Sequence, residues 1–180
     1  MAFSHLEQLI AEYLEWNGFF VKKNIKVGPL AHGGWEMELD IIGYNPSLQK
    51  LVHYEPSIDA DPWEKRELRY KKKFIAGQKY IKTEILKSMN LNCNLEQVAV
   101  LVSHPKNRDT IAGGKLLSID ELMKEIKDEV CNRGIMGKNA IPESYPLLRT
   151  IQLTMCGYYK NLTVHAFNDQ LSPLLKKKHQ

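Results

Sequence analysis

Two carboxylates, Asp40 and Glu55, lie near the ends of two neighbouring strand-like runs, 36–42 and 51–55. Successive side chains of a strand point to opposite faces of the sheet. The segment 44–47 between the runs is rich in residues that favour turns. If the runs pair as a hairpin, the two carboxylates can share one face at neighbouring strand ends. Such a pair offers hard oxygen ligands to Mg²⁺ or Mn²⁺, and a metal bound there can activate water against a phosphodiester.

The remaining acids of this hairpin have plainer interpretations. A row of acidic side chains on one face of a hairpin is ordinarily the solvated face, which suits Glu36 beside the preceding loop. It suits Asp40 less well, because Asp is rare in strands and this one precedes Ile41 and Ile42. An acid in an apolar setting needs a partner or an ion. Glu38 shares the face of Asp40, so it either completes the metal site or pairs with a lysine.

The elements that must position these residues follow one another in the order helix, three strands, helix, strand, helix. Apolar spacing of 3.6 residues predicts helices over 3–16 and 62–88. For the second helix, Asp61 is the expected N-cap and Pro62 the first helical residue. The expected strands are 19–27, 36–43, 51–57 and 97–103. This order predicts an α/β fold, with a mixed sheet between flanking helices.

Residues 97 to 158 are predicted to hold a central strand and two further helices. The apolar run 97–103 predicts a central strand, parallel to an earlier one because a helix separates them. Residues 104–114 are expected to form a polar loop. Ser118 and Glu121 predict a capping box that opens a further helix. A last helix is expected within 142–158, with Leu147, Leu148, Ile151 and Met155 on one face.

The run Glu38-Leu39-Asp40-Ile41, followed by a turn, an apolar strand and Glu55, resembles the PD-(D/E)XK nuclease superfamily. The resemblance covers about residues 3 to 103 and includes the opening helix and first strand. It implies a restriction-endonuclease-like core, in the order αβββαβ, over 1–105. Residues 106–175 would be a C-terminal helical extension of the same domain, and 176–180 a disordered basic tail. The superfamily's opening helix often carries a glutamate facing the metal, and Glu7 occupies the matching position. Its alternative role is a capping box with Ser4.

One departure concerns a lysine. The superfamily motif ends in a lysine two residues after the strand glutamate, and Ser57 stands there instead. That lysine helps position the attacking water and stabilises phosphate charge, so another cation must replace it if the site is active. Lys73 is the first candidate, because it lies beside Phe74 at the edge of the predicted apolar stripe. Lys72 and Arg66 are its rivals, and each of the three is otherwise a solvent-facing residue.

The positive charge of the chain is concentrated on the helix predicted after residue 62. Between residues 64 and 87 there are nine Lys or Arg and three Glu, a net charge of +6 in a chain whose formal charge is +4. This is either a solvated basic face or a surface that contacts phosphates. The candidates for nucleic-acid contact are Arg66, Arg69, Lys72 and Lys73.

Three functions are consistent with these residues. The first is a nuclease that hydrolyses DNA with Mg²⁺ or Mn²⁺, in which Asp40 and Glu55 bind the metal, Glu7 or Glu38 completes its shell, and Lys73 supplies the missing cation. The second is a nucleic-acid-binding module with the same fold and a degenerate site, which the serine at position 57 favours. The third is a structural protein whose basic helix binds an acidic partner.

Composition bounds the remaining expectations. The chain has 180 residues, is 43% hydrophobic and 26% charged, and contains no apolar run of the length that a membrane span needs. Its three cysteines, Cys93, Cys131 and Cys156, show no metal-binding spacing, so reduced cysteines in a cytoplasmic protein are expected. Relatives that cut both strands commonly dimerise, so a homodimer is a further expectation that follows from the resemblance.

Overall fold

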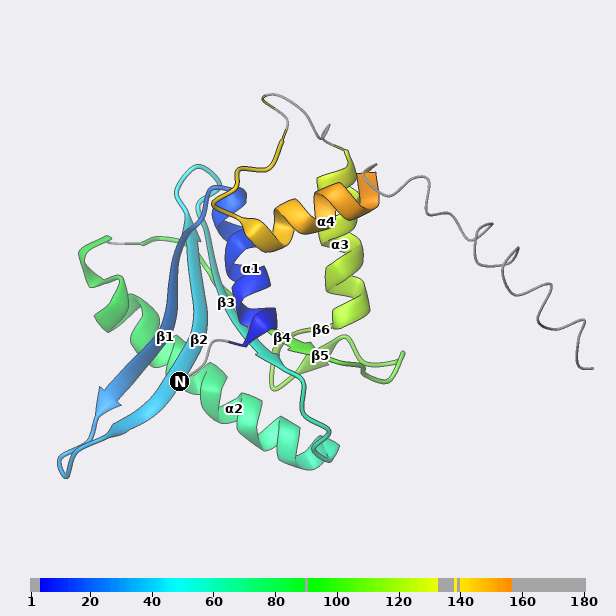
Figure 1. Ribbon diagram of the computed structural model, residues 1–180. Coiled ribbons are helices and arrows are strands. Elements are labelled where there is room, and N and C mark those ends of the chain that lie inside the picture. Colours follow the sequence, from blue (N-terminus) through cyan, green and yellow to red (C-terminus); the bar gives the residue numbers. More distant parts are fainter. Residues whose placement is uncertain (1–3, 90, 133–137, 139, 157–180) are drawn as a thin grey trace, which may run out of the picture. The chain divides into compact units, whose positions relative to one another are not determined.

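The computed structural model of the protein describes residues 4–89, 91–132, 138 and 140–156 (Figure 1). The chain divides into two compact units, residues 1–126 and 127–180. The first unit holds the whole sheet and every candidate site residue. The expected basic tail, 176–180, lies outside the described residues.

A six-stranded mixed sheet is the centre of the first unit (Figure 1). In chain order its strands are β1 (Phe20–Pro29), β2 (Trp35–Asn45), β3 (Lys50–Ser57), β4 (Leu95–Leu101), β5 (Thr110–Ile111) and β6 (Gly114–Ser118). In space the order is β1-β2-β3-β4-β6-β5. The first three strands form an antiparallel meander, whereas β4 is parallel to both β3 and β6. The expected α/β class, the four predicted strands and the parallel central strand are therefore confirmed.

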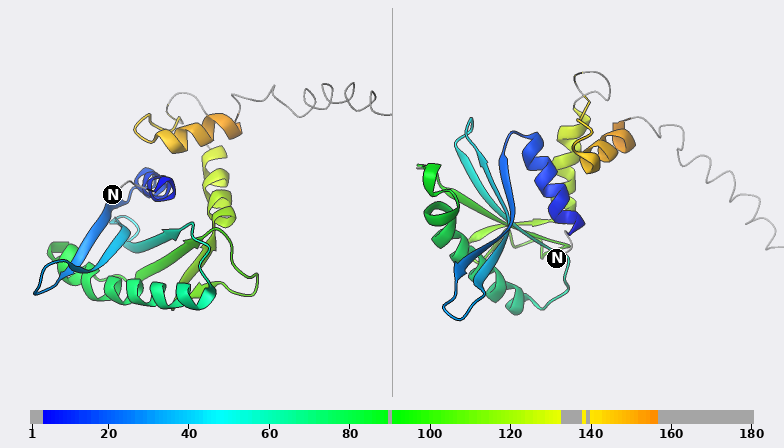
Figure 2. Two further views of the ribbon diagram at one scale, coloured as in Figure 1. Left: turned by 60° about the horizontal axis from the view of Figure 1, so that its bottom comes forward. Right: turned by 60° about the vertical axis from the view of Figure 1, so that its left-hand side comes forward.

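Two long helices cover opposite faces of this sheet (Figure 2, left). They are α1 (His5–Trp16) and α2 (Trp63–Tyr80). A π-helical turn η1 (Ile81–Ile85) and a 3₁₀ turn η2 (Lys87–Met89) continue from α2. Two further helices follow the sheet, α3 (Ile119–Cys131) and α4 (Pro146–Cys156). None of the helices in the described part of the chain has the length and apolar composition of a transmembrane span.

The face of α2 that packs on the sheet is built from aromatic and small residues. Tyr70 and Phe74 are almost completely buried, in one apolar cluster with residues of β4 and β6. Full burial of such a side chain stabilises the fold by about 1.5–3 kcal/mol. Gly77 permits the close approach that the sequence suggested, because a Cβ there would lie 2.6 Å from Nδ1 of His53. The helix therefore sits directly over β3, close enough for its side chains to reach acids on that strand.

Several boundaries and caps differ from the sequence predictions. Pro62, and not Asp61, occupies the N-cap position of α2, and Asp61 accepts hydrogen bonds from Lys65 and Arg69 instead. Residues 110–111 form β5 within the expected polar loop 104–114, and residues 114–118 form β6, which was not predicted. Both strands are too short for a clear alternation. Met155 is exposed although it was assigned to the apolar face of the last helix.

Of the two predicted capping boxes, one is complete and the other is half formed. In α3 the Ser118 backbone N–H donates to the Glu121 carboxylate at 2.7 Å, and the Glu121 N–H donates to Ser118 Oγ at 3.1 Å. In α1, Ser4 stands at the N-cap but its side chain makes no capping hydrogen bond. The Glu7 carboxylate does accept a hydrogen bond from the Ser4 backbone, which acts to lower the pKa of Glu7, so this box is half formed and Glu7 is engaged at the helix end.

Candidate active site

The hairpin of β2 and β3 brings Asp40 and Glu55 together. The two strands pair with Ile41 opposite Tyr54, so Asp40 and Glu55 are one step further along the same ladder. The backbone N–H of Asp40 donates to Glu55 Oε1 at 3.2 Å. The carboxylate of Glu55 is 1% exposed, whereas that of Asp40 keeps 15% of its side-chain surface in contact with solvent. The predicted pair of neighbouring carboxylates is thus present, with one acid buried and the other at the opening.

Lys73 of α2 reaches both carboxylates. Its Nζ donates to Asp40 Oδ1 at 2.7 Å and also to Glu55 Oε2. The lysine follows Tyr70 by three residues and precedes Phe74, so the packing of these two rings on the sheet directs it toward the strand acids. Lys73 was the predicted cation because it lies at the edge of the apolar stripe of α2, and the structure places its ammonium group at the two acids. Its catalytic role stays a prediction.

Burial and the charges of neighbouring groups determine the pKa values of Asp40 and Lys73, which with Glu55 form the triad of this site. Burial, followed by the hydrogen bond and negative charge of Glu55, raises the pKa of Asp40 to about 7, against the opposing effect of Lys73. Burial alone would lower the pKa of Lys73, but Glu55 and Asp40 outweigh it and raise that pKa. The lysine is therefore an ammonium ion at neutral pH, and Asp40 is close to its midpoint of ionisation. The two acids therefore hold the ammonium group of Lys73, and within this site Asp40 titrates near neutrality.

A row of buried polar side chains is joined to Glu55 by hydrogen bonds. His53 Nε2 lies 2.7 Å from Glu55 Oε1, and Gln97 Nε2 lies 3.1 Å from His53 Nδ1. Gln97 in turn accepts from Gln78 at 3.0 Å. Since Glu55 can only accept and the Gln97 amide nitrogen can only donate, His53 carries its proton on Nε2. Burial lowers the pKa of His53 to about 3, which keeps the ring neutral.

This row predicts the effect of His53→Leu. The substitution preserves most of the volume but leaves the Glu55 carboxylate and the Gln97 amide each short of one buried partner. We expect a loss of about 2–4 kcal/mol in the free energy of unfolding, measured by urea denaturation at pH 7. His32→Leu, on the exposed loop before β2, is the matched control and should change stability by less than about 0.5 kcal/mol. Equal stability of both variants would contradict a supporting role for His53.

The other predicted acids occupy different surroundings. Burial, then the negative charge of Asp40, raises the pKa of Glu7, so this α1 residue lies within electrostatic reach of the site. The charge of Glu38 also acts on Glu7 and raises its pKa further. Glu36 is exposed, as the solvated-face interpretation predicted, but it accepts hydrogen bonds from Tyr80 and, at 3.0 Å, from Lys79. Among the described residues, no group of three or more His, Cys, Asp or Glu side chains is arranged to hold a metal ion.

A small pocket opens beside the triad. Its volume is about 170 Å³, and its walls are Glu55, Pro56, Ser57, Arg69, Tyr70 and Lys73. Of the predicted nucleic-acid contacts, Arg69 therefore stands at the triad with Lys73. Arg66 lies one turn before Arg69 and bonds to Asp59, with its Nη2 2.6 Å from the Asp59 carbonyl oxygen. Lys72 is exposed on α2 and does not line this pocket.

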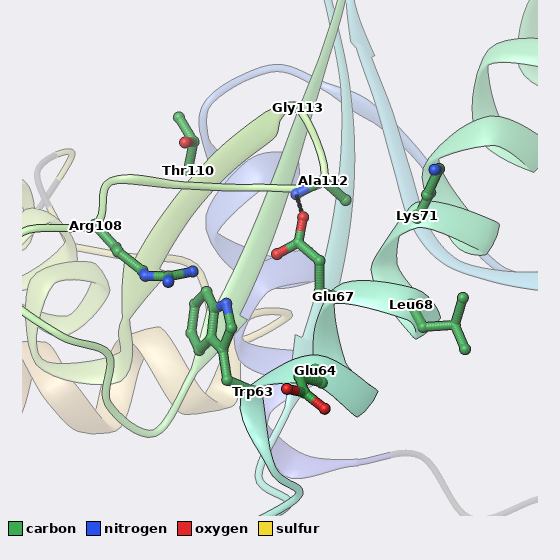
Figure 3. A pocket seen from close by; sticks show the side chains of 9 residues that line it. All are labelled: Trp63, Glu64, Glu67, Leu68, Lys71, Arg108, Thr110, Ala112 and Gly113. Carbon is green, nitrogen blue, oxygen red and sulfur yellow. Dashed lines mark hydrogen bonds between the residues drawn. The ribbon is translucent and has the colours of Figure 1, made fainter.

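A larger hollow, of about 650 Å³, lies on the other flank of α2 (Figure 3). The first turns of the helix and the segment 108–113 enclose it. The Arg108 guanidinium lies 4.6 Å from the ring centre of Trp63, and Glu67 accepts from the Ala112 N–H at 2.8 Å. Lys71 lines this hollow, so it points away from Asp40 and Glu55, as its place on the helix predicted.

Gln97 is the site residue that the sequence analysis missed. It was counted as part of the apolar run 97–103, where its polarity was the one available signal. A polar side chain at the start of a central strand must find a buried partner, and that partner is His53, which the alternation of β3 places on the same face as Glu55.

Comparison with protein-family models, with curated proteins and with solved structures finds no match for this chain.

Proposed function

We propose that this protein is a metal-dependent nuclease that hydrolyses phosphodiester bonds in DNA. The observation that carries the proposal is the contact of Lys73 with both Asp40 and Glu55. A cation that the sequence motif lacks at position 57 is supplied at the same two acids by a different element. The chain order, a helix, an antiparallel meander, a crossover helix and a parallel strand, supports assignment of a restriction-endonuclease-like core.

The donor set suits Mg²⁺ or Mn²⁺. Asp40 and Glu55 offer carboxylate oxygens, and Mg²⁺ is commonly held by one or two carboxylates while water and substrate phosphate fill its other positions. The ion pairs of Lys73 with both acids show that Asp40 and Glu55 together stabilise a positive charge at this position. Asp40 and Glu55 would hold the ion, with Glu7 or Glu38 completing its shell. When bound, the metal would supply an activated water and offset the charge that develops on the phosphate.

The side chains themselves divide the remaining work. Lys73 is protonated and partly accessible, so it can donate to a phosphate oxygen as negative charge develops there. His53 fixes the orientation of Glu55 without carrying charge of its own. The basic residues of α2 supply the attraction to the DNA backbone that is independent of sequence.

A second candidate is a nucleic-acid-binding module with the same fold and no turnover. Two observations favour it: Ser57 replaces the motif lysine, and the Lys73 ammonium hydrogen-bonds to both acids that would have to bind the metal. In that case the fold and the basic helix serve binding alone.

Calorimetric titration with Mn²⁺ and a cleavage assay on plasmid and linear DNA separate the two candidates. The nuclease proposal expects saturable Mn²⁺ binding and cleavage that requires Mg²⁺ or Mn²⁺ and stops with a chelator. DNA binding with neither metal binding nor cleavage would reject the nuclease and leave the binding module. If the protein shows no affinity for DNA even at low salt, both candidate functions are rejected.

A further inference from the structure

The carboxylate of Asp59, in the segment between β3 and α2, is surrounded by hydrogen-bond donors. Asp59 Oδ2 accepts from the Ser57 hydroxyl and from Arg69 Nη2, the latter at 2.6 Å. Its Oδ1 accepts from the Asp61 N–H at 3.1 Å and from Arg66 Nε at 3.3 Å. Burial alone would raise the pKa of Asp59, but the hydrogen bonds from Ser57, Asp61 and Arg69 lower it to about 2. The carboxylate is therefore ionised at every pH at which the protein would work.

This cluster of donors adjoins the candidate active site. Ser57 and Arg69 belong both to the donors around Asp59 and to the walls of the pocket that holds Glu55 and Lys73. Arg69 keeps a third of its side chain exposed, so an incoming anion can reach its guanidinium. A nucleic-acid strand with one phosphate beside Lys73 would bring a neighbouring phosphate toward Arg69.

The donors around Asp59 are those that bind phosphate. A guanidinium presents a fork of N–H groups that matches phosphate oxygens as well as carboxylate oxygens. Hydroxyl and backbone N–H groups, such as those of Ser57 and Asp61, are further common phosphate ligands. Asp59 itself lies in residues 58–62, which form neither helix nor strand, so this segment can move away at less cost than a regular element.

We propose that Ser57, Arg66 and Arg69 form a subsite for a backbone phosphate of DNA next to the scissile one, and that the Asp59 carboxylate fills this subsite until DNA displaces it. The inference deepens the proposed function and rests on it for the identity of the ligand. Its consequence is that Asp59 competes with DNA. The alternative is that these ion pairs only fasten the segment 58–62 to α2.

Removal of the competing charge tests the proposal. DNA affinity is measured by fluorescence anisotropy of a labelled duplex of about 20 base pairs, in EDTA and over a range of salt concentrations. Asp59→Asn should bind about threefold to tenfold more tightly than the wild type, with a salt slope steeper by about one. Glu64→Gln makes the same change in net charge on α2 without touching the two arginines, and should change affinity less than twofold. Equal or weaker binding by Asp59→Asn would overturn the subsite.

The proposal requires that the tighter DNA binding of Asp59→Asn depends on Arg69. Arg69→Gln in the Asp59→Asn background should cancel the tighter binding, whereas Lys71→Gln, on the opposite flank of α2, should leave it in place. If Asp59→Asn proves unfolded by circular dichroism, the same two substitutions in the wild type decide the matter. Arg69→Gln should then weaken binding at least about threefold more than Lys71→Gln, and equal losses would overturn the proposal.

Because these readouts are made without metal, they are independent of cleavage. A gain that depends on Arg69 in a protein that cuts nothing would support the phosphate subsite and reject the nuclease. Metal-dependent cleavage without the gain would reject the subsite alone.

Discussion

Asp40→Asn is expected to abolish both Mn²⁺ binding and DNA cleavage. Asp40 is the one of the two neighbouring carboxylates that reaches solvent, since Glu55 is buried behind it and engaged by His53. An amide of the same shape offers one neutral oxygen in place of a charged ligand, so metal affinity should fall below detection by calorimetry. Cleavage by this variant should be indistinguishable from the background without metal.

The same variant should be equally stable or more stable than the wild type, with a definite dependence on pH. The pKa of Asp40 rises from its ordinary value of 3.8 to about 7 on folding, so between these pH values the folded protein keeps a proton that the unfolded chain has released. The contribution of Asp40 to stability therefore falls as the pH rises from about 4 to about 7. Asp40→Asn removes this penalty, and relieves the repulsion between two crowded acids.

Thermal unfolding at two pH values checks this expectation. At pH 8 the variant should melt at the wild-type temperature or a few degrees above it, in line with ~1 kcal/mol of relieved repulsion. Near pH 4 the two proteins should melt alike, because Asp40 is then protonated in the folded state. A marked loss of stability at pH 8 would show that Asp40 is a structural partner of Lys73 and would count against a metal site.

The fold was largely predictable from the sequence because its elements are long and patterned. The meander of β1 to β3 follows from side-chain alternation, and β4 follows from an apolar run after a crossover helix. The strands β5 and β6 were missed, since two and five residues are too few to show a period. The end of α2 at Tyr80 was missed as well, because the apolar spacing continues through the π-helical turn with Ile81 and Ile85.

The site was predictable to the extent that it depends on strand register and helix faces. Asp40 and Glu55 come together because one register of the hairpin buries its apolar residues, and Lys73 joins them because Tyr70 and Phe74 fix the rotation of α2. What escaped the sequence analysis depends on contacts between distant elements. Gln97 meets His53 only through the parallel pairing of β3 and β4, with the two residues directly opposite each other. The ion pairs of Asp59 with Arg66 and Arg69 likewise depend on the path of the irregular segment 58–62. A periodic sequence pattern cannot predict that path.

Lys73→Ala is expected to lower the rate of cleavage by about 10²-fold or more, the effect of losing one charged contact to a transition state. Such a loss corresponds to ~2.7 kcal/mol in activation free energy. Removal of the ammonium also raises the pKa of Asp40 further, so the assay belongs at a pH well above 7 and at saturating Mn²⁺, where Asp40 remains ionised. Mn²⁺ affinity should be unchanged or higher, because a competing cation has left the two carboxylates.

Two further variants decide whether the position of the charge matters or only its presence on α2. Lys71→Ala removes the same charge two residues away, from a side chain that lines the opposite hollow, and should only slightly weaken DNA binding through one fewer phosphate contact. Equal loss of activity in the two variants would mean that α2 acts only as a binding surface. Ser57→Lys in the Lys73→Ala background returns an ammonium to the motif position, in the pocket that Ser57 shares with Glu55. Recovery of cleavage there, with Lys71→Ala near the wild-type rate, would show that the reaction requires a cation at these two carboxylates and accepts it from either strand or helix.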